Sequence, residues 1–194
     1  EALREAISRF EQVNMEEILC GNGAAELFFA AVQAVWPQKA LVIAPSFSEY
    51  EEALRSVGAE VEYYYLCEED NFQIRGDYVD KLSEEIDMIF LCNPNNPTGQ
   101  TIDRDMLIKI LDRCKKQNIV VILDECFLEF LDEPNRYEMS DLRGEYPNLL
   151  IIKAFTKIFS MPGLRLGYAI SSNQDILEEM SWKLQQWNVS VPAQ

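Results

Sequence analysis

Lys157 and the residues around it have the chemical types needed to bind a carbonyl group and a phosphate. Lys157 lies five residues beyond an apolar run at 149–152, directly after Thr156, and Arg165 follows eight residues later. A lysine just beyond an apolar strand is expected to be partly desolvated, which lowers its pKa and makes the neutral amine available for Schiff-base chemistry. Thr156 and Arg165 supply donors that a phosphate dianion needs. The alternative is a surface lysine followed by an arginine in a solvated turn.

A second polar segment, Asn-Pro-Asn-Asn-Pro-Thr-Gly at 93–99, directly follows the apolar run that ends at Cys92. Two prolines and a glycine predict an irregular loop at the carboxyl end of a strand, where open α/β sheets place their ligands. Asn96 would then point its amide into that crevice. A plain turn explains the same composition.

Two acids, Asp124 and Glu125, end the buried-strand pattern at 120–123. A carboxylate at the end of a central strand is costly to bury unless it meets a cation or a strong donor. A cationic ligand nitrogen beside Asp124 would meet that need. A metal-binding carboxylate pair and a helix cap are the alternatives, and the metal site is the weaker one because the chain has no histidine.

Two further segments have the right position for a ligand. Gly21 to Glu26 runs through two glycines into a helical pattern, so the backbone N–H groups of Gly23, Ala24 and Ala25 would form a phosphate cradle strengthened by the helix dipole. A glycine-eased turn capped by Asn22 is equally compatible. Tyr50 follows the predicted strand at 41–44 and would offer a flat face to an aromatic cofactor, or would pack in the core.

The composition narrows the function. Net charge is −16, with 33 acidic and 17 basic residues, so nucleic acids and anionic membranes would be repelled over most of the surface. The absence of histidine excludes Ser/His/Asp and Cys/His nucleophilic mechanisms. Five cysteines without a C-x-x-C pair suit reduced thiols, and no uncharged apolar stretch is long enough for a membrane span. We therefore expect a soluble cytoplasmic protein without a metal.

Short aliphatic runs alternate with longer amphipathic segments, which predicts βα units and a mostly parallel sheet in one domain. The expected strands are 41–44, 61–66, 88–92, 120–123, 149–152 and 167–171. The expected helices are 1–13, 24–35, 48–57, 103–117 and 174–184, the fourth with Asp103 as its N-cap. Each of the five chemical signals follows a predicted strand end, so parallel strands would bring them to one edge of the sheet.

In their order and spacing these motifs resemble the class I/II aminotransferases, which are fold-type I enzymes dependent on pyridoxal 5′-phosphate (PLP). The resemblance rests on Asn-Asn-Pro-Thr-Gly, Asp-Glu, Thr-Lys and Gly-Leu-Arg-Leu-Gly-Tyr, and it covers essentially the whole chain. It implies a three-layer α/β/α fold in which residues 1–194 form the PLP-binding large domain. A C-terminal small domain and an N-terminal arm would lie outside this segment, and the full-length enzyme would be a homodimer.

The resemblance also implies a role for each candidate residue. Lys157 would form the Schiff base and move the substrate's α-proton, Asp124 would pair with the pyridinium N1, and Asn96 would hydrogen-bond O3′. Tyr50 would stack on the ring. The phosphate would be held by Gly23, Ala24, Ala25, Thr156 and Arg165. The substrates would be an amino acid or a phosphorylated amino acid or amine, and the reaction an amino transfer to a 2-oxo acid, as in histidinol-phosphate aminotransferases.

Two departures from the family pattern keep other functions open. Ala154 and Phe127 stand where many relatives have a hydroxyl residue and a tyrosine, respectively. Phe127 and the Met161-Pro162-Gly163 segment are closer to threonine-phosphate decarboxylases, so PLP-dependent decarboxylation is the first alternative. A non-catalytic PLP-binding fragment is the second. A nucleotide- or phosphometabolite-binding module that uses only the loop at 21–25 is a third.

Overall fold

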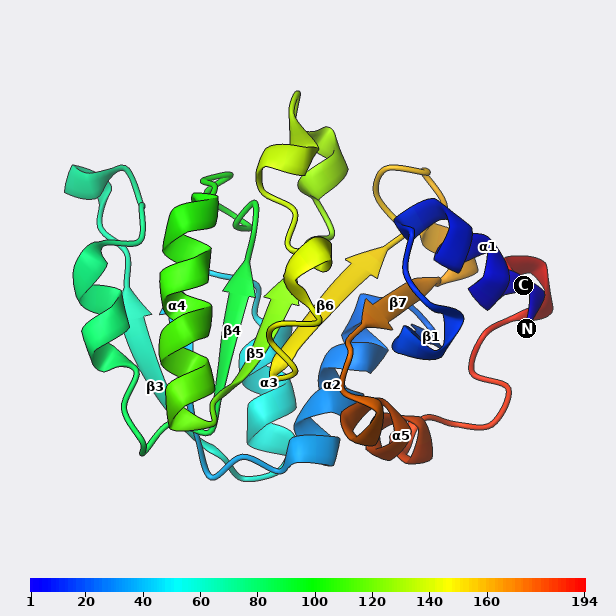
Figure 1. Cartoon of the computed structure of the whole chain (residues 1–194), viewed down its shortest axis with the longest axis horizontal. Coiled ribbons are helices and arrows are strands. Elements are labelled where there is room, and N and C mark those ends of the chain that lie inside the picture. The colour runs from blue at the N-terminus through cyan, green and yellow to red at the C-terminus, as the bar shows by residue number, and fades with distance from the viewer.

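A seven-stranded sheet forms the middle layer of the computed structural model, which describes residues 1–194 (Figure 1). Its strands are β1 (Ile18–Gly21), β2 (Lys39–Ala44), β3 (Glu60–Tyr65), β4 (Met88–Cys92), β5 (Val120–Asp124), β6 (Leu149–Ala154) and β7 (Gly167–Ile170). They lie in the order β1-β7-β6-β5-β4-β2-β3. Only β7 pairs antiparallel with its neighbours, so the other strands all run in one direction.

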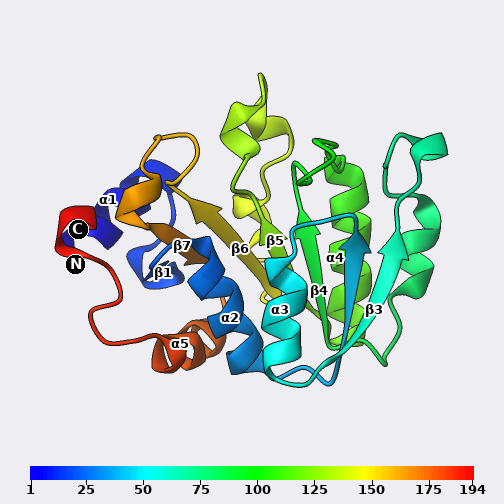
Figure 2. The ribbon, with the colours of Figure 1, turned by 180° about the vertical axis from the view of Figure 1, so that it is seen from behind.

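Helices cover both faces of this sheet. The α-helices are α1 (Ala2–Glu11), α2 (Ala24–Val35), α3 (Glu49–Ser56), α4 (Arg104–Gln117) and α5 (Gln174–Lys183). Helices α2, α3 and α5 lie together on one face, toward the viewer in Figure 2, whereas α1 and α4 lie on the opposite face. Short 3₁₀ turns fill the connections, at Met15–Glu17, Glu68–Asp70, Gly76–Lys81, Leu128–Phe130, Pro134–Arg136, Ser140–Leu142, Pro162–Leu164 and Val191–Ala193. The predicted three-layer α/β/α fold is therefore confirmed.

Most of the predicted elements are present with small shifts at their ends. Strand β4 and helix α2 have the predicted bounds, and the remaining predicted elements differ by one or two residues at an end. For strand β1 only the end was predicted, at the turn through Gly21, because four residues give too little pattern to set bounds and its strand pairing comes only from β7, far along the chain. Asp103 occupies the predicted N-cap position of α4, but its side chain makes no capping hydrogen bond.

Alternation along the central strands sends neighbouring side chains to opposite faces. On β6, Leu149 and Ile151 pack into the core on the α1/α4 side, whereas Leu150 and Ile152 pack into the core on the α2 side. All four are at most 1% exposed, and burying such a side chain stabilises the fold by about 1.5–3 kcal/mol. Both faces of the central strands are thus fixed by core packing.

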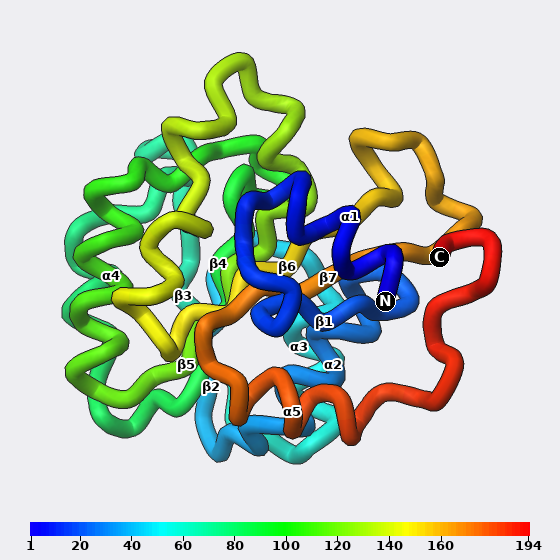
Figure 3. Tube along the Cα trace, turned by 45° about the vertical axis from the view of Figure 1, so that its right-hand side comes forward, coloured from blue at the N-terminus to red at the C-terminus, as the bar shows by residue number.

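The direction of the strands decides where ligands can bind. The carboxyl ends of β1, β2, β4, β5 and β6 lie along one edge of the sheet, and the residues that lead into β7 lie there too because β7 runs the opposite way. This is the upper edge in Figure 1. The chain termini lie beside α1, at the end of the molecule where β1 and β7 close the sheet (Figure 3).

Gly167, the first residue of β7, allows this strand to touch the turn before α2. A Cβ at this position would lie 2.6 Å from the backbone nitrogen of Ala24 and 2.7 Å from the carbonyl carbon of Gly23. Both atoms are backbone, so relief requires movement of the turn itself. Any side chain at 167 would therefore push the start of α2 away from the sheet.

We predict that Gly167→Ala lowers the free energy of unfolding by about 1–3 kcal/mol, because a methyl group overpacks this contact. Urea denaturation of the variant and the wild type measures the difference. Gly144→Ala is the matched control: it has no atom within 4 Å of its added Cβ, and should change stability by less than about 0.5 kcal/mol. Equal stability of the two variants would contradict the proposed contact.

Candidate cofactor site

A cavity of about 170 Å³ opens at the carboxyl edge of the sheet. Its walls come from the start of α2, the loops after β2, β4, β5 and β6, and the turn before β7. The lining residues are Ala24, Ala25, Phe28, Phe47, Asn96, Asp124, Cys126, Phe127, Ala154, Thr156, Lys157 and Arg165. Seven predicted site residues are among them. Of the other two, Gly23 lies directly behind the wall and Tyr50 lies beneath it.

Asp124, at the end of β5, is the acid in the wall of this cavity and is 4% exposed. Its Oδ2 accepts a hydrogen bond from the Tyr50 hydroxyl at 2.5 Å, and its Oδ1 accepts one from the Cys126 backbone N–H at 2.9 Å. Burial raises the pKa of Asp124, and the bonds from Cys126 and Tyr50 oppose that shift. The result is a carboxylate in a fixed orientation that suits a protonated ring nitrogen.

The stacking role predicted for Tyr50 is wrong for this structure. Its side chain is 0% exposed, and its ring stacks on Phe90 with centroids 4.8 Å apart. Burial and the neighbouring Asp124 raise the pKa of Tyr50 well above its usual value, so the hydroxyl keeps its proton and remains a donor. Phe47, three residues earlier in the loop that leads into α3, is the aromatic side chain of this segment that reaches the cavity.

The phosphate-binding candidates lie at one end of the cavity. Ala24 and Ala25 open α2, and N–H groups in the first turn of a helix have no partner within the helix. Gly23 has φ +83°, and a Cβ there would lie 2.5 Å from Nη2 of Arg165. Glycine therefore leaves the space that the guanidinium occupies beside the helix start. Thr156 adds a hydroxyl on the same wall.

Lys157 lines the cavity, but it does so from an exposed position in the loop after β6. The expectation of a partly desolvated lysine is therefore wrong in this structure, because the strand ends at Ala154 and the chain leaves the core before residue 157. Its Nζ lies 5.6 Å from the centroid of the Phe127 ring. The amine thus lies near the ring of Phe127, and both residues line the cavity.

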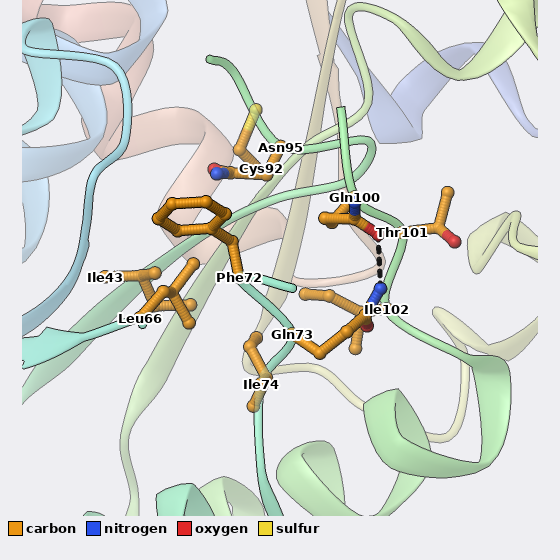
Figure 4. A pocket seen from close by; sticks show the side chains of 10 residues that line it. All are labelled: Ile43, Leu66, Phe72, Gln73, Ile74, Cys92, Asn95, Gln100, Thr101 and Ile102. Atoms are coloured by element: carbon orange, nitrogen blue, oxygen red, sulfur yellow. Dashed lines mark hydrogen bonds between the residues drawn. The ribbon is translucent and has the colours of Figure 1, made fainter. Parts of the chain in front are cut away.

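Asn96 reaches the cavity from a well-braced loop. The side chain of its neighbour Asn95 donates to the carbonyl of Pro45 at 3.1 Å and to Oγ1 of Thr98 at 2.9 Å, which ties the loops after β2 and β4 together. On the far side of Asn95 lies a cavity of only about 10 Å³, closed by Phe72 and by the hydrogen bond between Gln73 and Gln100 (Figure 4). That space is about one water molecule in size, so this second cavity is packing that supports the loop.

Sequence reasoning missed three residues of the wall as site residues, namely Phe28, Phe47 and Cys126. Phe28 follows Ala24 by four residues on α2 and therefore lies on the same helix face. Cys126 comes two residues after Asp124, and Phe47 lies in the segment already chosen for Tyr50. Their positions in the sequence could have suggested both residues, but only the structure shows whether Phe47 or Tyr50 reaches the cavity.

The wall residues suit a phosphorylated aromatic aldehyde such as PLP. An anion has helix N–H groups, a hydroxyl and Arg165 at one end, an aromatic ring has Phe47, and a protonated ring nitrogen has Asp124. A carbonyl group has the Lys157 amine. The chemistry of this donor set and the space kept open by Gly23 fit such a cofactor without any change in the fold.

Comparison with known proteins gives consistent results. The model of the aminotransferase class I and II family matches residues 1–194. The chain is 36% identical over 191 residues to the threonine-phosphate decarboxylase of Salmonella typhimurium, covering 98% of this chain and 52% of that protein. It is 37% identical over 199 residues to a histidinol-phosphate aminotransferase of Desulfitobacterium hafniense, covering 99% and 53%. The chain thus spans about half the length of these relatives.

Solved structures show the same relationship. The histidinol-phosphate aminotransferase of Clostridium acetobutylicum superimposes with a TM-score of 0.88 at 32% identity, over 96% of this chain and 55% of that chain. The L-threonine-O-3-phosphate decarboxylase of Porphyromonas gingivalis gives a TM-score of 0.83 at 26% identity, over 99% and 55%. The resemblance seen in the sequence motifs is confirmed, and PLP is the cofactor of this family. No helix of the structure has the length and apolar character needed to cross a membrane.

We predict that Tyr50→Phe destabilises the protein by about 1–3 kcal/mol at neutral pH, because it leaves one oxygen of a buried carboxylate without its donor. The loss raises the pKa of Asp124 further. A group with a raised folded-state pKa contributes stability that is full below its unfolded pKa and is lost as the pH rises. The difference in unfolding free energy between wild type and Tyr50→Phe should therefore decrease toward about pH 4, near the unfolded pKa of an aspartate.

Chemical denaturation of Tyr50→Phe and wild type from acid to neutral pH measures this effect. Tyr64→Phe is the matched control, since it removes a hydroxyl that donates to the half-exposed carboxylate of Asp77. That change should cost less, because water can replace the lost donor. A loss of unfolding free energy in Tyr50→Phe that is the same at every pH would show that the pKa of Asp124 does not depend on this hydrogen bond.

Proposed function

Because the chain belongs to the aminotransferase class I and II family, we propose that it is the cofactor-binding part of a PLP-dependent aminotransferase similar to histidinol-phosphate aminotransferases. Such an enzyme moves an amino group between an amino acid, or a phosphorylated amino acid or amine, and a 2-oxo acid. One observation carries the proposal. A single cavity is lined by a buried acid held in place by two hydrogen bonds, by a lysine amine and by the start of helix α2.

In this proposal each wall residue has one task. Asp124 would hold the protonated ring nitrogen of the cofactor, and Asn96 would donate to its phenolic oxygen. Ala24, Ala25, Thr156 and Arg165 would bind the phosphate, while Gly23 leaves room for the guanidinium. Phe47 would cover the ring face. PLP supplies an electron sink when it is bound.

Lys157 is the proposed catalytic base. Its amine would hold the carbonyl end of the bound cofactor and would take the proton from the substrate α-carbon. The flexible four-carbon stem of a lysine allows the amine to move between both positions. Phe127 lies beside it and contributes no hydrogen-bond donor.

Phe127 is also the observation that favours a second function, PLP-dependent decarboxylation of a phosphorylated amino acid. Phe127 has no hydroxyl group, so Asn96 would be the one side-chain donor for the phenolic oxygen of the cofactor in the proposed site. The two reactions differ in which bond of the α-carbon stands perpendicular to the ring, and the residues that bind the substrate carboxylate decide this. The candidate site includes no group for that carboxylate. A PLP-binding domain with little turnover of its own is the third possibility.

Further parts of the proposal concern the whole protein. We propose that residues 1–194 form the large domain, that the full-length enzyme is a cytoplasmic homodimer, and that the rest of the chain and the partner complete the substrate site. The span of about half the length of the relatives supports this arrangement.

The decisive experiment uses the full-length protein with histidinol phosphate, threonine phosphate and common amino acids. Amino transfer to a 2-oxo acid and release of carbon dioxide are followed in parallel. We expect amino transfer as the main reaction. Carbon dioxide release from threonine phosphate without amino transfer would favour the decarboxylase over the aminotransferase. If neither reaction occurs, the PLP-binding domain with little turnover is the function that stands.

We predict that PLP attaches to Lys157 and to no other lysine with comparable yield. After PLP addition and borohydride reduction, peptide mass spectrometry should find the pyridoxyl group on the peptide that contains Lys157, because only this amine faces the phosphate-binding end of the cavity. Lys157→Arg should abolish the adduct, whereas Lys116→Arg, at an exposed site on α4, should leave it unchanged. An adduct that survives Lys157→Arg would refute the assignment.

A further inference from the structure

A buried lysine surrounded by carboxyl groups lies on the face of the sheet opposite the cofactor cavity. Nζ of Lys153 is 2.9 Å from Glu11, 3.1 Å from Glu138, 3.7 Å from Glu125 and 3.9 Å from Glu129. We call these five residues the Lys153 cluster. They join β6, α1, the end of β5 and the segment 128–140, although they are far apart in the sequence.

The positive charge of the cluster is too small to balance its four carboxyl groups. Lys153 is 4% exposed and is its one cation, and the hydroxyl of Tyr168 donates to Glu11. Arg143 is engaged by Glu17 at 2.9 Å, and Arg104 is paired with Asp141 at 2.6 Å. Both arginines are therefore committed to acids outside the cluster.

Glu125 is the most deeply buried carboxyl group of the cluster. It is 0% exposed; its Oε1 accepts a hydrogen bond from the Met139 backbone N–H at 3.3 Å, and its Oε2 has no hydrogen-bond partner. Glu11 and Glu138 both approach Lys153 more closely than it does. Burial raises the pKa of Glu125 to about 8, with the charges of Glu138 and Glu11 adding to the shift and Lys153 opposing it. A neutral Glu125 at physiological pH relieves the crowding of charge.

The cluster is mechanically connected to the cofactor site. Glu125 directly follows Asp124, and its backbone N–H donates to the carbonyl of Ile152 at 2.9 Å. Lys153 directly precedes Ala154, which lines the cavity. Side chains alternate along both strands, so a shift that the cluster causes on one face moves the strand ends that carry Asp124 and the Lys157 loop on the other.

We propose that the Lys153 cluster is a pH-sensitive clamp in which Lys153 and Glu125 act as positioning residues for the cofactor site. While Glu125 is neutral, the cluster holds α1 and residues 125–140 on the sheet. Ionisation of Glu125 adds a negative charge beside Glu11 and Glu138 and loosens both segments. A cavity of about 590 Å³ opens in front of the cluster, lined by Glu11, Glu129, Glu138 and Lys153, and gives the loosened segments access to water.

The sign of the pH dependence follows from linkage. The folded-state pKa of Glu125, about 8, lies above its ordinary value of 4.5, so the folded protein holds a proton that the unfolded chain has released between these values. The stabilising effect is therefore full below about pH 4.5 and is lost as the pH rises through 8. Glu125→Gln keeps the neutral side chain at every pH.

The test is hydrogen–deuterium exchange of the full-length protein without PLP, with Glu125→Gln and wild type compared at each pH so that the intrinsic exchange rate cancels. Peptides from α1 and from residues 125–140 should exchange at similar rates in both proteins at pH 4.5. As the pH rises from 4.5 to 8, the wild type should exchange progressively faster than Glu125→Gln, by at least about tenfold at pH 8, and the difference should level off above that pH. Glu133→Gln, an exposed site in the same segment, should behave as wild type at every pH.

A wild type and Glu125→Gln that exchange alike at every pH would overturn the clamp. Glu138→Gln gives a second reading should Glu125→Gln not fold. Removing the charge of Glu138 lowers the folded-state pKa of Glu125, so the pH at which the acceleration of exchange levels off should move down, whereas a merely structural role would leave that pH unchanged.

The consequence for the cofactor rests on the proposed function and is measured separately. Equilibrium dialysis with PLP should show that the wild type binds it more weakly at pH 9 than at pH 6, and that Glu125→Gln loses less affinity. Failure to bind PLP at either pH would refute the proposed function but would leave the exchange result, and with it the clamp, standing. Equal pH dependence of PLP binding in both proteins would refute the coupling.

Discussion

The buried carboxylate of Asp124 imposes the strictest requirement on this structure. A charge at the end of a central strand is tolerated only with donors on both oxygens, and here the backbone of Cys126 and the hydroxyl of Tyr50 supply them. Tyr50 in turn must be buried to reach it, which requires α3 to pack closely on the sheet and Phe90 to offer its ring. A large part of the α2-side core is thereby organised around one acid.

Because side chains alternate along a strand, buried charges occur on both faces of β5 and β6. Asp124 and Ala154 face the cavity, while Glu125 and Lys153, their chain neighbours, face α1. The two faces solve the problem of buried charge differently. On the cavity face, neutral donors hold the single carboxylate of Asp124. On the α1 face, four carboxyl groups share one lysine, and the excess of negative charge favours a proton bound to Glu125. A change in packing on either face would therefore move the ends of β5 and β6, which also carry the charged residues of the other face.

Local sequence patterns determined what could be predicted. Strand β4 and helix α2 have strong apolar patterns, and both were predicted with the correct bounds. Strand ends also placed Asp124, Asn96, Thr156 and Arg165 around one cavity. The stacking role of Tyr50 and the partial desolvation of Lys157 were wrong. The choice between Tyr50 and Phe47 depends on a contact of Tyr50 with Asp124, 74 residues away. The Lys153 cluster was invisible for the same reason, since Lys153 and Glu11 are separated by 142 residues.

The acidic composition also limits how an anionic cofactor can be held. A net charge of −16 repels a phosphate at long range, but salt screens exposed charges beyond about 8 Å at physiological ionic strength. In the proposed site, attraction comes from groups in direct contact with the phosphate, namely the α2 N–H groups, Thr156 and Arg165. Because Gly23 leaves space for the Arg165 guanidinium beside the helix start, two kinds of donor lie next to each other there. Binding of the phosphate would thus depend on the geometry of one turn more than on the charge of the whole domain.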